Sequence, residues 1–483
     1  MELVLLLMSH LRNMAKQNKR TRIVCTIGPA SSKPLTLQKM MRAGMDVARL
    51  NFSHATHKDH AKVIRLVRSS ARKVGKHVPI IGDLQGPKIR LGKLPDEGVV
   101  LKAGTTVSIS TDLKSYKGGA LPVTYVGLHK DVKKGERFLI DDGLLELRVE
   151  KVSGRTINAK VITGGKVISH KGMNFPDSTL KVSSITKKDR MDARFGAEQG
   201  VDWMALSFVT SVKDVKTLKR LIKTHTTKGQ SPARVIVKIE KPAAIENFDE
   251  ILAAADGVMV ARGDLGIEID AEEVPIRQKE MIDKCRAVGK PVVVATQMMD
   301  SMIRNPRPTR AEVSDVANAV FDHTDGVMLS GESATGEYPL QTVKMMAKIA
   351  MEAEDSVYDD VSVDSDDVND SHLAAARAIK LLASDGAIQG VLASHELAPW
   401  SERALTMHPE IPLFIATRDA RVARQVALHW SAVPFVVKSQ KESTFVRAAI
   451  KALKKQRLVK KGMRLVVLIG HPYGEGIDLV TVE

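Results

Sequence analysis

The chain has 483 residues, of which 43% are hydrophobic, 27% charged and 4% aromatic, a balance that is typical of folded proteins and excludes the disordered and fibrous classes. This length suits about three domains. Lysine and arginine number 73 against 56 aspartates and glutamates, and the resulting net charge of +17 favours anionic partners such as phosphates, nucleotides or nucleic acid. The two cysteines form no CxxC pair, which excludes a disulfide framework and indicates a reducing compartment.

Residues 1–20 are predicted to form a basic leader. Their apolar stretch precedes the basic residues, Glu2 lies where a secretory signal carries positive charge, and no small-residue cleavage site follows. A secretory signal and a true start at Met8 or Met14 are the alternatives. No run reaches the ~18 apolar residues of a membrane span, so we expect a cytoplasmic protein without a membrane partner.

The chain then repeats one pattern, in which a β-branched apolar run of strand length ends at polar residues and a helical stretch follows. Eight such units predict an α/β fold with a closed (β/α)₈ TIM barrel, formed by residues 21–88 and 178–350. A doubly wound open sheet is the alternative. The expected strands lie within residues 22–29, 46–54, 78–85, 202–209, 234–240, 257–265, 291–298 and 326–333.

Residues 89–177 break this pattern, because apolar and polar residues alternate there between glycine-containing turns. They predict a small β-barrel-like domain inserted after the third barrel strand, where it would overhang the active-site face and act as a lid. Residues 351–372 are expected to be an acidic connector. Residues 373–483 alternate helix and strand again, which predicts a C-terminal α/β domain on an open sheet.

Polar and charged side chains end six of the eight expected strands. The C-terminal ends of barrel strands meet at one face, so these side chains are expected to surround one pocket. They are Arg49, Asn51, Ser53 and His54 after the second strand, Asp83, Lys88 and Arg90 after the third, Lys238 and Glu240 after the fifth, Arg262 and Asp264 after the sixth, Thr296 after the seventh, and Ser330 and Glu332 after the eighth.

Three of these residues indicate a metal site. Lys238 and Glu240 are two apart on a strand and share one face, and a buried charge there asks for a compensating ion, with a plain ion pair as the alternative. Glu240 and Asp264 supply the hard oxygen ligands that suit Mg²⁺ or Mn²⁺. Zinc is not expected, because no His/Cys cluster has zinc spacing.

Two arginines, a lysine and a divalent cation around one pocket are typical of a site that handles phosphate, since phosphoryl transfer depends on positioning and charge neutralisation. The sequence has no G-x-x-x-x-G-K-[ST] loop and no kinase H-R-D signature. ARGDLG is rich in glycine but does not match G-x-G-x-x-G.

Eight strings of residues 20–350 together carry a family resemblance. They are, in chain order, TRIVCTIGPAS, GMDVARLNFSH, GDLQGPKIR, VKIE, VMVARGDLG, ATQMMDSM, PTRAEVSDVANAV and DGVMLSGESATGEYP. On these strings the sequence closely resembles the pyruvate kinase family. The resemblance implies a Mg²⁺-dependent phosphotransferase of glycolysis that moves a phosphoryl group from phosphoenolpyruvate to ADP, giving pyruvate and ATP, as a homotetramer.

The resemblance also implies roles for single residues. Lys238 would stabilise the transferred phosphoryl group, Thr296 would stand near the path by which the enolate is protonated, and Glu240 and Asp264 would hold Mg²⁺. Arg49, Lys238, Gly263, Asp264 and Thr296 would bind phosphoenolpyruvate or pyruvate. Asn51, His54, Arg90 and Lys188 would contact the nucleotide, and Arg90 would also serve in catalysis.

The sequence departs from the family pattern at the potassium site. Asn51, Ser53 and Asp83 remain, but Leu84 and Lys88 replace the Thr and Glu of potassium-dependent members. An ammonium at Lys88 would supply the positive charge that the ion brings, so the chain resembles the potassium-independent subgroup and potassium is not expected to be required. The usual glycine after Ser-His is Ala55, where the turn is expected to differ.

The C-terminal domain departs further. Members of the family often bind an effector phosphate there on a glycine-rich loop, whereas this chain reads ASHELAPWSERA without glycine. Ser394, His395, Ser401 and Arg403 could still meet an anion, but solvated loop residues are the favoured interpretation and activation by a sugar phosphate is not expected.

Two other functions stay open on the residues alone. Another barrel enzyme acting on phosphoenolpyruvate or pyruvate with a metal, such as an aldolase or a mutase, would not need the inserted domain or Lys188. A non-catalytic nucleic-acid-binding protein would use basic segments such as residues 451–461, but no aromatic-interleaved motif accompanies them and no nucleic-acid partner is expected.

Overall fold

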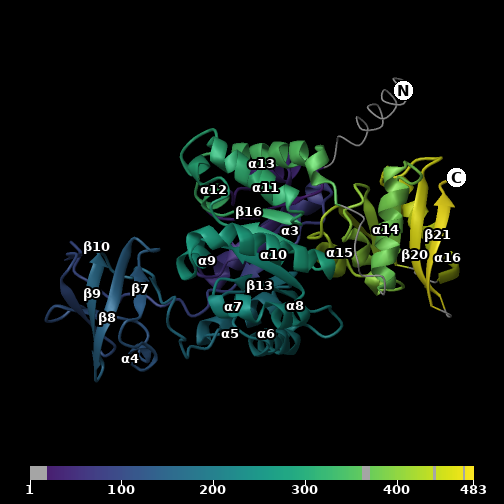
Figure 1. Ribbon diagram of the computed structural model, residues 1–483. Helices are drawn as coiled ribbons and strands as arrows, with labels where there is room; N and C mark the ends of the chain where they lie inside the picture. Colours follow the sequence, from purple (N-terminus) through teal and green to yellow (C-terminus); the bar gives the residue numbers. More distant parts are fainter. Residues whose placement is uncertain (1–18, 362–369, 439–441, 472–473) are drawn as a thin grey trace.

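The computed structural model describes residues 19–361, 370–438, 442–471 and 474–483. Most of the predicted leader and the centre of the acidic connector lie outside these ranges. The chain forms three bodies in a row, an inserted β domain, a central barrel and a C-terminal α/β domain (Figure 1). No helix of the described part is long and apolar enough to cross a membrane.

The central body is a closed barrel of parallel strands in the order β1-β16-β15-β14-β13-β12-β3-β2. All eight predicted strands are present, so the barrel is confirmed and the open sheet is not adopted. The strands are β1 (Arg22–Thr26), β2 (Met45–Asn51), β3 (Ile80–Asp83), β12 (Trp203–Leu206), β13 (Arg234–Ile239), β14 (Gly257–Ala261), β15 (Val292–Ala295) and β16 (Gly326–Leu329).

Barrel residues alternate between two apolar layers. One face of the strands, with Val24, Ile81 and Trp203, fills the barrel interior, and the other, with Cys25 and Ile80, packs under the helices. Capping boxes at Thr186, Ser211 and Thr309 begin α5, α6 and α11. The helices are α2 (Pro34–Ala43), α3 (His57–Val74), α5 (Lys187–Glu198), α6 (Val212–His225), α7 (Pro242–Glu246), α8 (Phe248–Ala254), α9 (Arg262–Glu268), α10 (Val274–Ala287), α11 (Arg310–Phe321), α12 (Gly331–Ala334) and α13 (Pro339–Glu354).

The inserted domain lies between β3 and β12, which are neighbours in the barrel. It has a six-stranded sheet of order β11-β7-β8-β9-β5-β6, a two-stranded sheet β10-β4 and a hydrophobic core of its own. Its elements are β4 (Val99–Leu101), β5 (Thr106–Ser110), β6 (Ala120–Pro122), α4 (Leu128–Asp131), β7 (Arg137–Ile140), β8 (Leu145–Ser153), β9 (Thr156–Thr163), β10 (Gly165–Val167) and β11 (Met173–Asn174).

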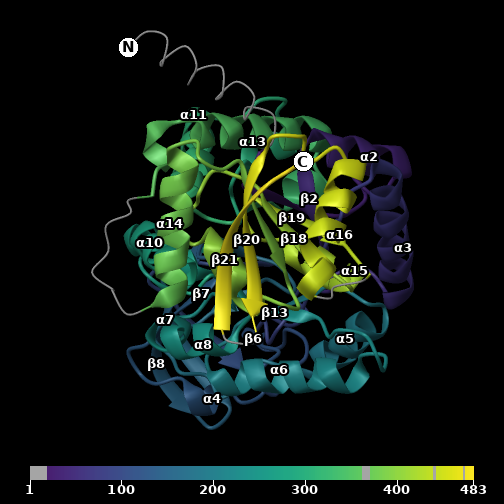
Figure 2. The ribbon, with the colours of Figure 1, turned by 90° about the vertical axis from the view of Figure 1, so that its right-hand side faces the viewer.

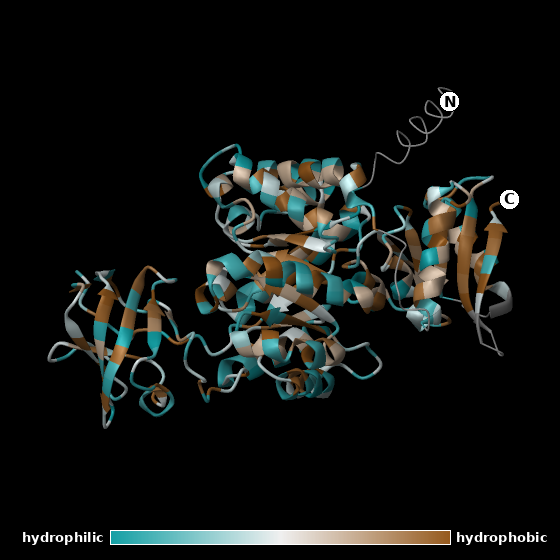
Figure 3. Cartoon of the chain, viewed as in Figure 1, coloured by the Kyte–Doolittle hydropathy of each residue, from teal (hydrophilic) through white to brown (hydrophobic). Residues whose placement is uncertain are grey.

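The C-terminal domain is a five-stranded sheet of order β19-β18-β17-β20-β21, with an antiparallel edge strand. Its strands are largely hydrophobic, like those of the barrel (Figure 3). The elements are α14 (Ser371–Ser384), β17 (Gly390–Ser394), β18 (Leu413–Thr417), α15 (Ala420–Val426), β19 (Ala432–Val436), α16 (Glu442–Lys455), β20 (Arg464–His471) and β21 (Gly474–Thr481). A 3₁₀ helix, Pro399–Leu405, lies between β17 and β18.

This domain closes the end of the barrel that lies opposite the inserted domain (Figures 1 and 2). Leu428 joins the apolar cluster of the barrel interior. Arg234, at the start of β13, donates to both carboxylate oxygens of Glu402 at 3.0 and 3.1 Å. Burial raises the pKa of Glu402, but Arg234 and His429 outweigh it and hold that pKa well below its usual value. The two bodies are therefore joined by an apolar plug and a buried ion pair.

His408 is buried in the same interface, where its ring stacks on Trp430 with centroids 4.1 Å apart. Burial lowers the pKa of His408 well below its usual value, and the positive charges of Arg286 and Lys380 and the neighbouring His323 act in the same direction. The folded chain therefore keeps this imidazole neutral at pH values where the unfolded chain protonates it.

We expect this difference to make the folded state lose stability as the pH falls below about 6.5, since the unfolded state then binds the additional proton. His408→Asn removes the titrating group, and asparagine tolerates the φ of +44° at this position. The free energy of unfolding should fall more steeply with acid for the wild type than for the variant, by at most about 1.4 kcal/mol per pH unit. Thermal unfolding at a series of pH values measures the difference. Parallel curves between pH 6.5 and 5 would contradict this assignment.

Candidate active site

The C-terminal ends of the barrel strands bring together the side chains of Arg49, Asp83, Lys238 and Glu240, which form the charge cluster. The strand register sets Asn51 of β2 beside Asp83 of β3. Arg49 donates through Nε to Asp83 Oδ2 at 2.6 Å and through Nη1 to Thr26 Oγ1 at 2.8 Å. Lys238 Nζ lies 3.7 Å from the other Asp83 oxygen, Oδ1. Asp83 therefore lies between a guanidinium and an ammonium.

Burial and charge act in opposite directions on these groups. Burial raises the pKa of Asp83, but Lys238 and Arg49 outweigh it and the net pKa is lowered. Burial lowers the pKa of Lys238, but Asp83 and Glu240 outweigh it and the net pKa is raised. The cluster thus keeps a buried ammonium charged where a solitary one would lose its proton.

Lys238 is held from two further sides. Its Nζ lies 2.7 Å from Glu240 Oε1 and donates to Ser207 Oγ at 2.8 Å. Ser207 Oγ in turn donates to the carbonyl of Leu84 at 2.7 Å, so its lone pairs face the ammonium. The position of the Lys238 charge is therefore defined by three barrel strands.

Glu240 has the features of a metal ligand. Its Oε2 accepts the N–H of Phe208 at 2.7 Å, whereas the buried Oε1 has an ion-pair contact to Lys238 and no hydrogen bond of good geometry within the described residues. Burial raises the pKa of Glu240 by more than the Lys238 ammonium lowers it, and the nearby Asp264 carboxylate raises it further. A divalent cation between the two carboxylates would stabilise the charged form of both, so the donor set fits Mg²⁺ or Mn²⁺.

No group of three or more His, Cys, Asp and Glu side chains in the described part of the chain could hold a metal. Mg²⁺ is commonly bound by a pair of carboxylates, with substrate oxygens and water completing the shell, and so does not require such a group.

The first turn of α9 meets the end of β15. The Gly263 N–H donates to Thr296 Oγ1 at 2.6 Å, and a Cβ at position 263 would lie only 3.2 Å from that oxygen. Thr296 has a φ of +72°, which β-branched residues rarely adopt. Arg262 stabilises this turn by donating to the Thr296 carbonyl at 2.9 Å and to both oxygens of Asp315 at 2.6 and 2.7 Å.

The predicted nucleotide residues are spread over the rim and the inserted domain. Lys188 Nζ donates to the Phe52 carbonyl and to Asp192, both at 2.5 Å. Arg90 pairs with Gly172 in an isolated bridge of the inserted domain, and its guanidinium donates to the His170 carbonyl at 3.0 Å.

The other two predicted nucleotide residues lie just after β2. The Asn51 side chain accepts the N–H of Ser53 at 3.0 Å, and the exposed His54 accepts a bond from His60 through its carbonyl. Next to them, Ala55 adopts a φ of +63°, so the turn keeps a left-handed shape without the usual glycine.

Lys88 contacts a different carboxylate from the one its predicted role suggests. Its Nζ lies 3.3 Å from Asp264 Oδ1. No hydrogen bond or ion pair joins it to Asn51, Ser53 or Asp83 among the described residues, and the buried Leu84 supplies no side-chain ligand. The Lys88 ammonium therefore lies next to Asp264, one of the two proposed metal ligands.

The four residues of the C-terminal domain were expected on a solvated loop, and this prediction is wrong for Ser394 and Ser401, whereas His395 and Arg403 are partly exposed. Ser394 ends β17, the central strand of the sheet, and Ser401 lies in the 3₁₀ helix, and both are fully buried. His395 Nδ1 lies 3.7 Å from Glu402, and Arg403 pairs with Asp370 at 2.5 Å. The segment faces the barrel and is covered by it.

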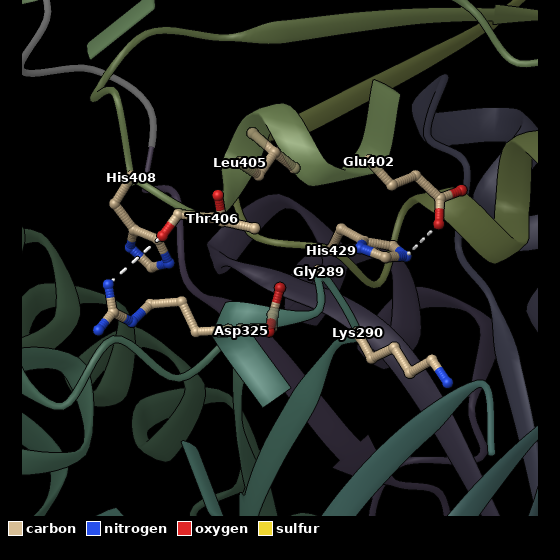
Figure 4. Close-up of a pocket in the computed structure, with 9 residues that line it drawn as sticks. Gly289, Lys290, Asp325, Glu402, Leu405, Thr406, His408 and His429 are labelled. Carbon is tan, nitrogen blue, oxygen red and sulfur yellow. Dashed lines mark hydrogen bonds and ion pairs between the residues drawn. The ribbon is translucent and has the colours of Figure 1, made fainter. Parts of the chain in front are cut away.

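A cavity lies beside this segment, between the barrel and the C-terminal domain (Figure 4). Its volume is about 20 Å³, enough for one water molecule and too small for a substrate. Its lining includes Arg286, Asp325, His408 and His429. None of the predicted site residues lines it, so it is separate from the charge cluster.

Two residues that contact the predicted site residues were missed in the sequence analysis. Ser207 follows β12, one of the two barrel strands from which no polar residue was selected, although the strand-end criterion used for the others applies to it. Asp315 lies on α11 and carries no local signal, because its role appears only when the chain brings Arg262 to it.

Comparisons with known proteins agree with this architecture. Residues 18–343 match the family model "Pyruvate kinase, barrel domain" and residues 401–482 match "Pyruvate kinase, alpha/beta domain". Among the relatives, the pyruvate kinase of Geobacillus stearothermophilus is 41% identical over 95% of this chain and 78% of its own length. That of Agrobacterium vitis is 39% identical over 95% and 96%.

A crystal structure of a pyruvate kinase from Cryptosporidium parvum superposes with a TM-score of 0.89 at 33% identity, covering 98% of both chains. The barrel, the inserted β domain and the C-terminal sheet are therefore shared along the whole chain. On these grounds the chain belongs to the pyruvate kinase family and is a phosphotransferase.

Proposed function

We propose that this chain transfers the phosphoryl group of phosphoenolpyruvate to ADP, with Mg²⁺ or Mn²⁺ as cofactor. The bond between phosphorus and the enol oxygen breaks, a bond to the β-phosphate oxygen of ADP forms, and the enolate carbon takes a proton to give pyruvate and ATP. The observation that carries the proposal is the buried Lys238 ammonium, 2.7 Å from Glu240 and paired with Asp83 at the rim of the barrel.

Glu240 and Asp264 would hold the divalent cation, which when bound neutralises charge on the phosphoryl oxygens. Lys238 would bind the same phosphoryl group while it passes from the enol oxygen to the β-phosphate oxygen of ADP. An ammonium that is already desolvated and oriented stabilises developing negative charge without reorganisation of the site. Arg49 would orient the phosphate from the neighbouring strand.

The carboxylate of phosphoenolpyruvate would lie at the first turn of α9, against Gly263 and Thr296, where backbone N–H groups and the helix dipole favour an anion. Thr296 would stand close to the carbon that is protonated. Asn51, His54, Arg90 and Lys188 would contact the nucleotide, and Arg90 would bring a charge from the inserted domain, which would exclude water by closing over the rim.

The proposal includes the localisation, the oligomeric state and the domain boundaries of the enzyme. A cytoplasmic homotetramer with the domain boundaries given above is the assembly that family membership suggests. Light scattering coupled to size-exclusion chromatography measures the mass directly, and a monomer would remove that part of the proposal.

The first test is the reaction itself, measured as pyruvate formation from phosphoenolpyruvate and ADP with Mg²⁺ in potassium-free buffer and after potassium is added. We expect comparable turnover in both, because Lys88 brings a positive charge to Asp264. In Lys88→Glu that charge is lost, and potassium should then raise the rate more than in the wild type. A wild type that is inert without potassium would overturn potassium independence, and no turnover in either buffer would overturn the proposed reaction.

A second test concerns the metal. Glu240→Gln keeps the side-chain shape and removes the charge, so the dissociation constant of Mn²⁺, measured by electron paramagnetic resonance without substrate, should rise at least about tenfold.

Glu332→Gln is the matched control for this variant. Glu332 is also a buried carboxylate at a strand end, but its oxygens accept N–H groups of Ser330 and Met299 at 2.7 and 3.2 Å. Its substitution should leave Mn²⁺ binding within about twofold of the wild type, since it is not a proposed ligand. Equal losses in both variants would contradict the assignment of Glu240.

A further inference from the structure

A buried carboxylate joins the inserted domain to the barrel. Glu268, the last residue of α9, has a fully buried side chain whose Oε1 accepts from Asn174 Nδ2 at 2.8 Å and from Lys241 Nζ at 2.6 Å. Asn174 is buried too. One oxygen atom thus receives an amide from one domain and an ammonium from another segment of the barrel.

The three residues lie on segments that carry the proposed chemistry. Asn174 ends β11, the last strand of the inserted domain. Lys241 directly follows Glu240 in the chain. Glu268 lies four residues after Asp264 on α9, about 6 Å along the helix axis and on the same helix face. In Figure 1, α9 lies on the side of the barrel that faces the inserted domain.

Burial restricts the movement of the residues that contact Glu268. A carboxylate removed from water is costly unless it is paired, so the buried Glu268 side chain favours arrangements in which Lys241 and Asn174 stay in place. The Lys241 ammonium also lies 5.8 Å from the centre of the Phe208 ring, and the Phe208 N–H binds Glu240. A displacement of the inserted domain therefore strains the segments on which both proposed metal ligands lie.

A second contact between the two domains has a different character. Arg137 of β7 lies 3.7 Å from Asp270, whose side chain is 61% exposed. Solvent and salt screen such a pair, so it contributes little to the orientation of the inserted domain.

We propose that Glu268 is a positioning residue that couples the orientation of the inserted domain to the placement of Glu240 and Asp264. This proposal rests on the proposed function for its effect on turnover, but not for its effect on the mobility of the domain. Glu268 touches no substrate in this account and acts through Asn174 on one side and Lys241 on the other.

The test uses two variants and one control in the full-length chain. Asn174→Leu removes the amide from the domain side and leaves the Glu268–Lys241 pair intact. Glu268→Gln removes the charge that holds Lys241. Asp270→Asn, which breaks the exposed contact, is the matched control.

Hydrogen exchange of the substrate-free chain reports the mobility. Both variants should speed exchange in the two segments that connect the inserted domain to the barrel, residues 84–92 and 172–180, by about tenfold or more, whereas the control should match the wild type. In steady-state kinetics, Asn174→Leu should lower kcat/KM for ADP by about tenfold while binding of phosphoenolpyruvate in the absence of ADP changes less than about twofold. Glu268→Gln should in addition weaken Mn²⁺ binding by about threefold or more.

Wild-type exchange in Asn174→Leu, or the same change in the Asp270→Asn control, would overturn the proposal. If Glu268→Gln fails to fold, Asn174→Leu still decides the matter, because it leaves the barrel side of the contact untouched. Faster exchange in the variants of a chain whose wild type shows no turnover would overturn the proposed function and leave the coupling standing.

Discussion

The site depends on the balance between burial and charge around Lys238. A buried ammonium alone would lose its proton, and the adjacent carboxylates of Asp83 and Glu240 prevent this. The same ammonium and Arg49 keep Asp83 ionised. Glu240 is the exception, because its burial outweighs the effect of the Lys238 ammonium and, together with the nearby Asp264 carboxylate, raises its pKa. A cation between Glu240 and Asp264 would stabilise the charged form of both carboxylates, which is the physical reason to expect one there.

The fold supplies the stiffness that this balance needs. A closed barrel fixes the strand register, and with it the positions of Arg49, Asp83 and Lys238 along the barrel axis. The C-terminal domain closes the opposite end through Leu428 and the Arg234–Glu402 pair. The inserted domain has its own core and meets the barrel through polar contacts such as that of Glu268.

The strands and the residues at their ends could be predicted because each depends on a short stretch of sequence, an apolar run and the polar residues after it. Contacts between distant segments could not be predicted in this way. The residues around Asn174 and Asp315 carry no local pattern that identifies Glu268 and Arg262 as their partners. The solvated loop predicted around Ser394 failed for a related reason. The segment is polar, but β17 is the centre of its sheet, and Ser394 and Ser401 are fully buried. Whether the named residues have their expected roles stays a prediction.

The most direct measurement is the pH dependence of kcat/KM for phosphoenolpyruvate in the wild type and in Asp83→Asn. If Asp83 keeps Lys238 protonated, removing its charge lowers the pKa of Lys238, and the alkaline limb of the profile should move to lower pH by about one unit or more. An alkaline limb at the same pH in both proteins would contradict the account, because the charge on Lys238 would then not depend on the cluster.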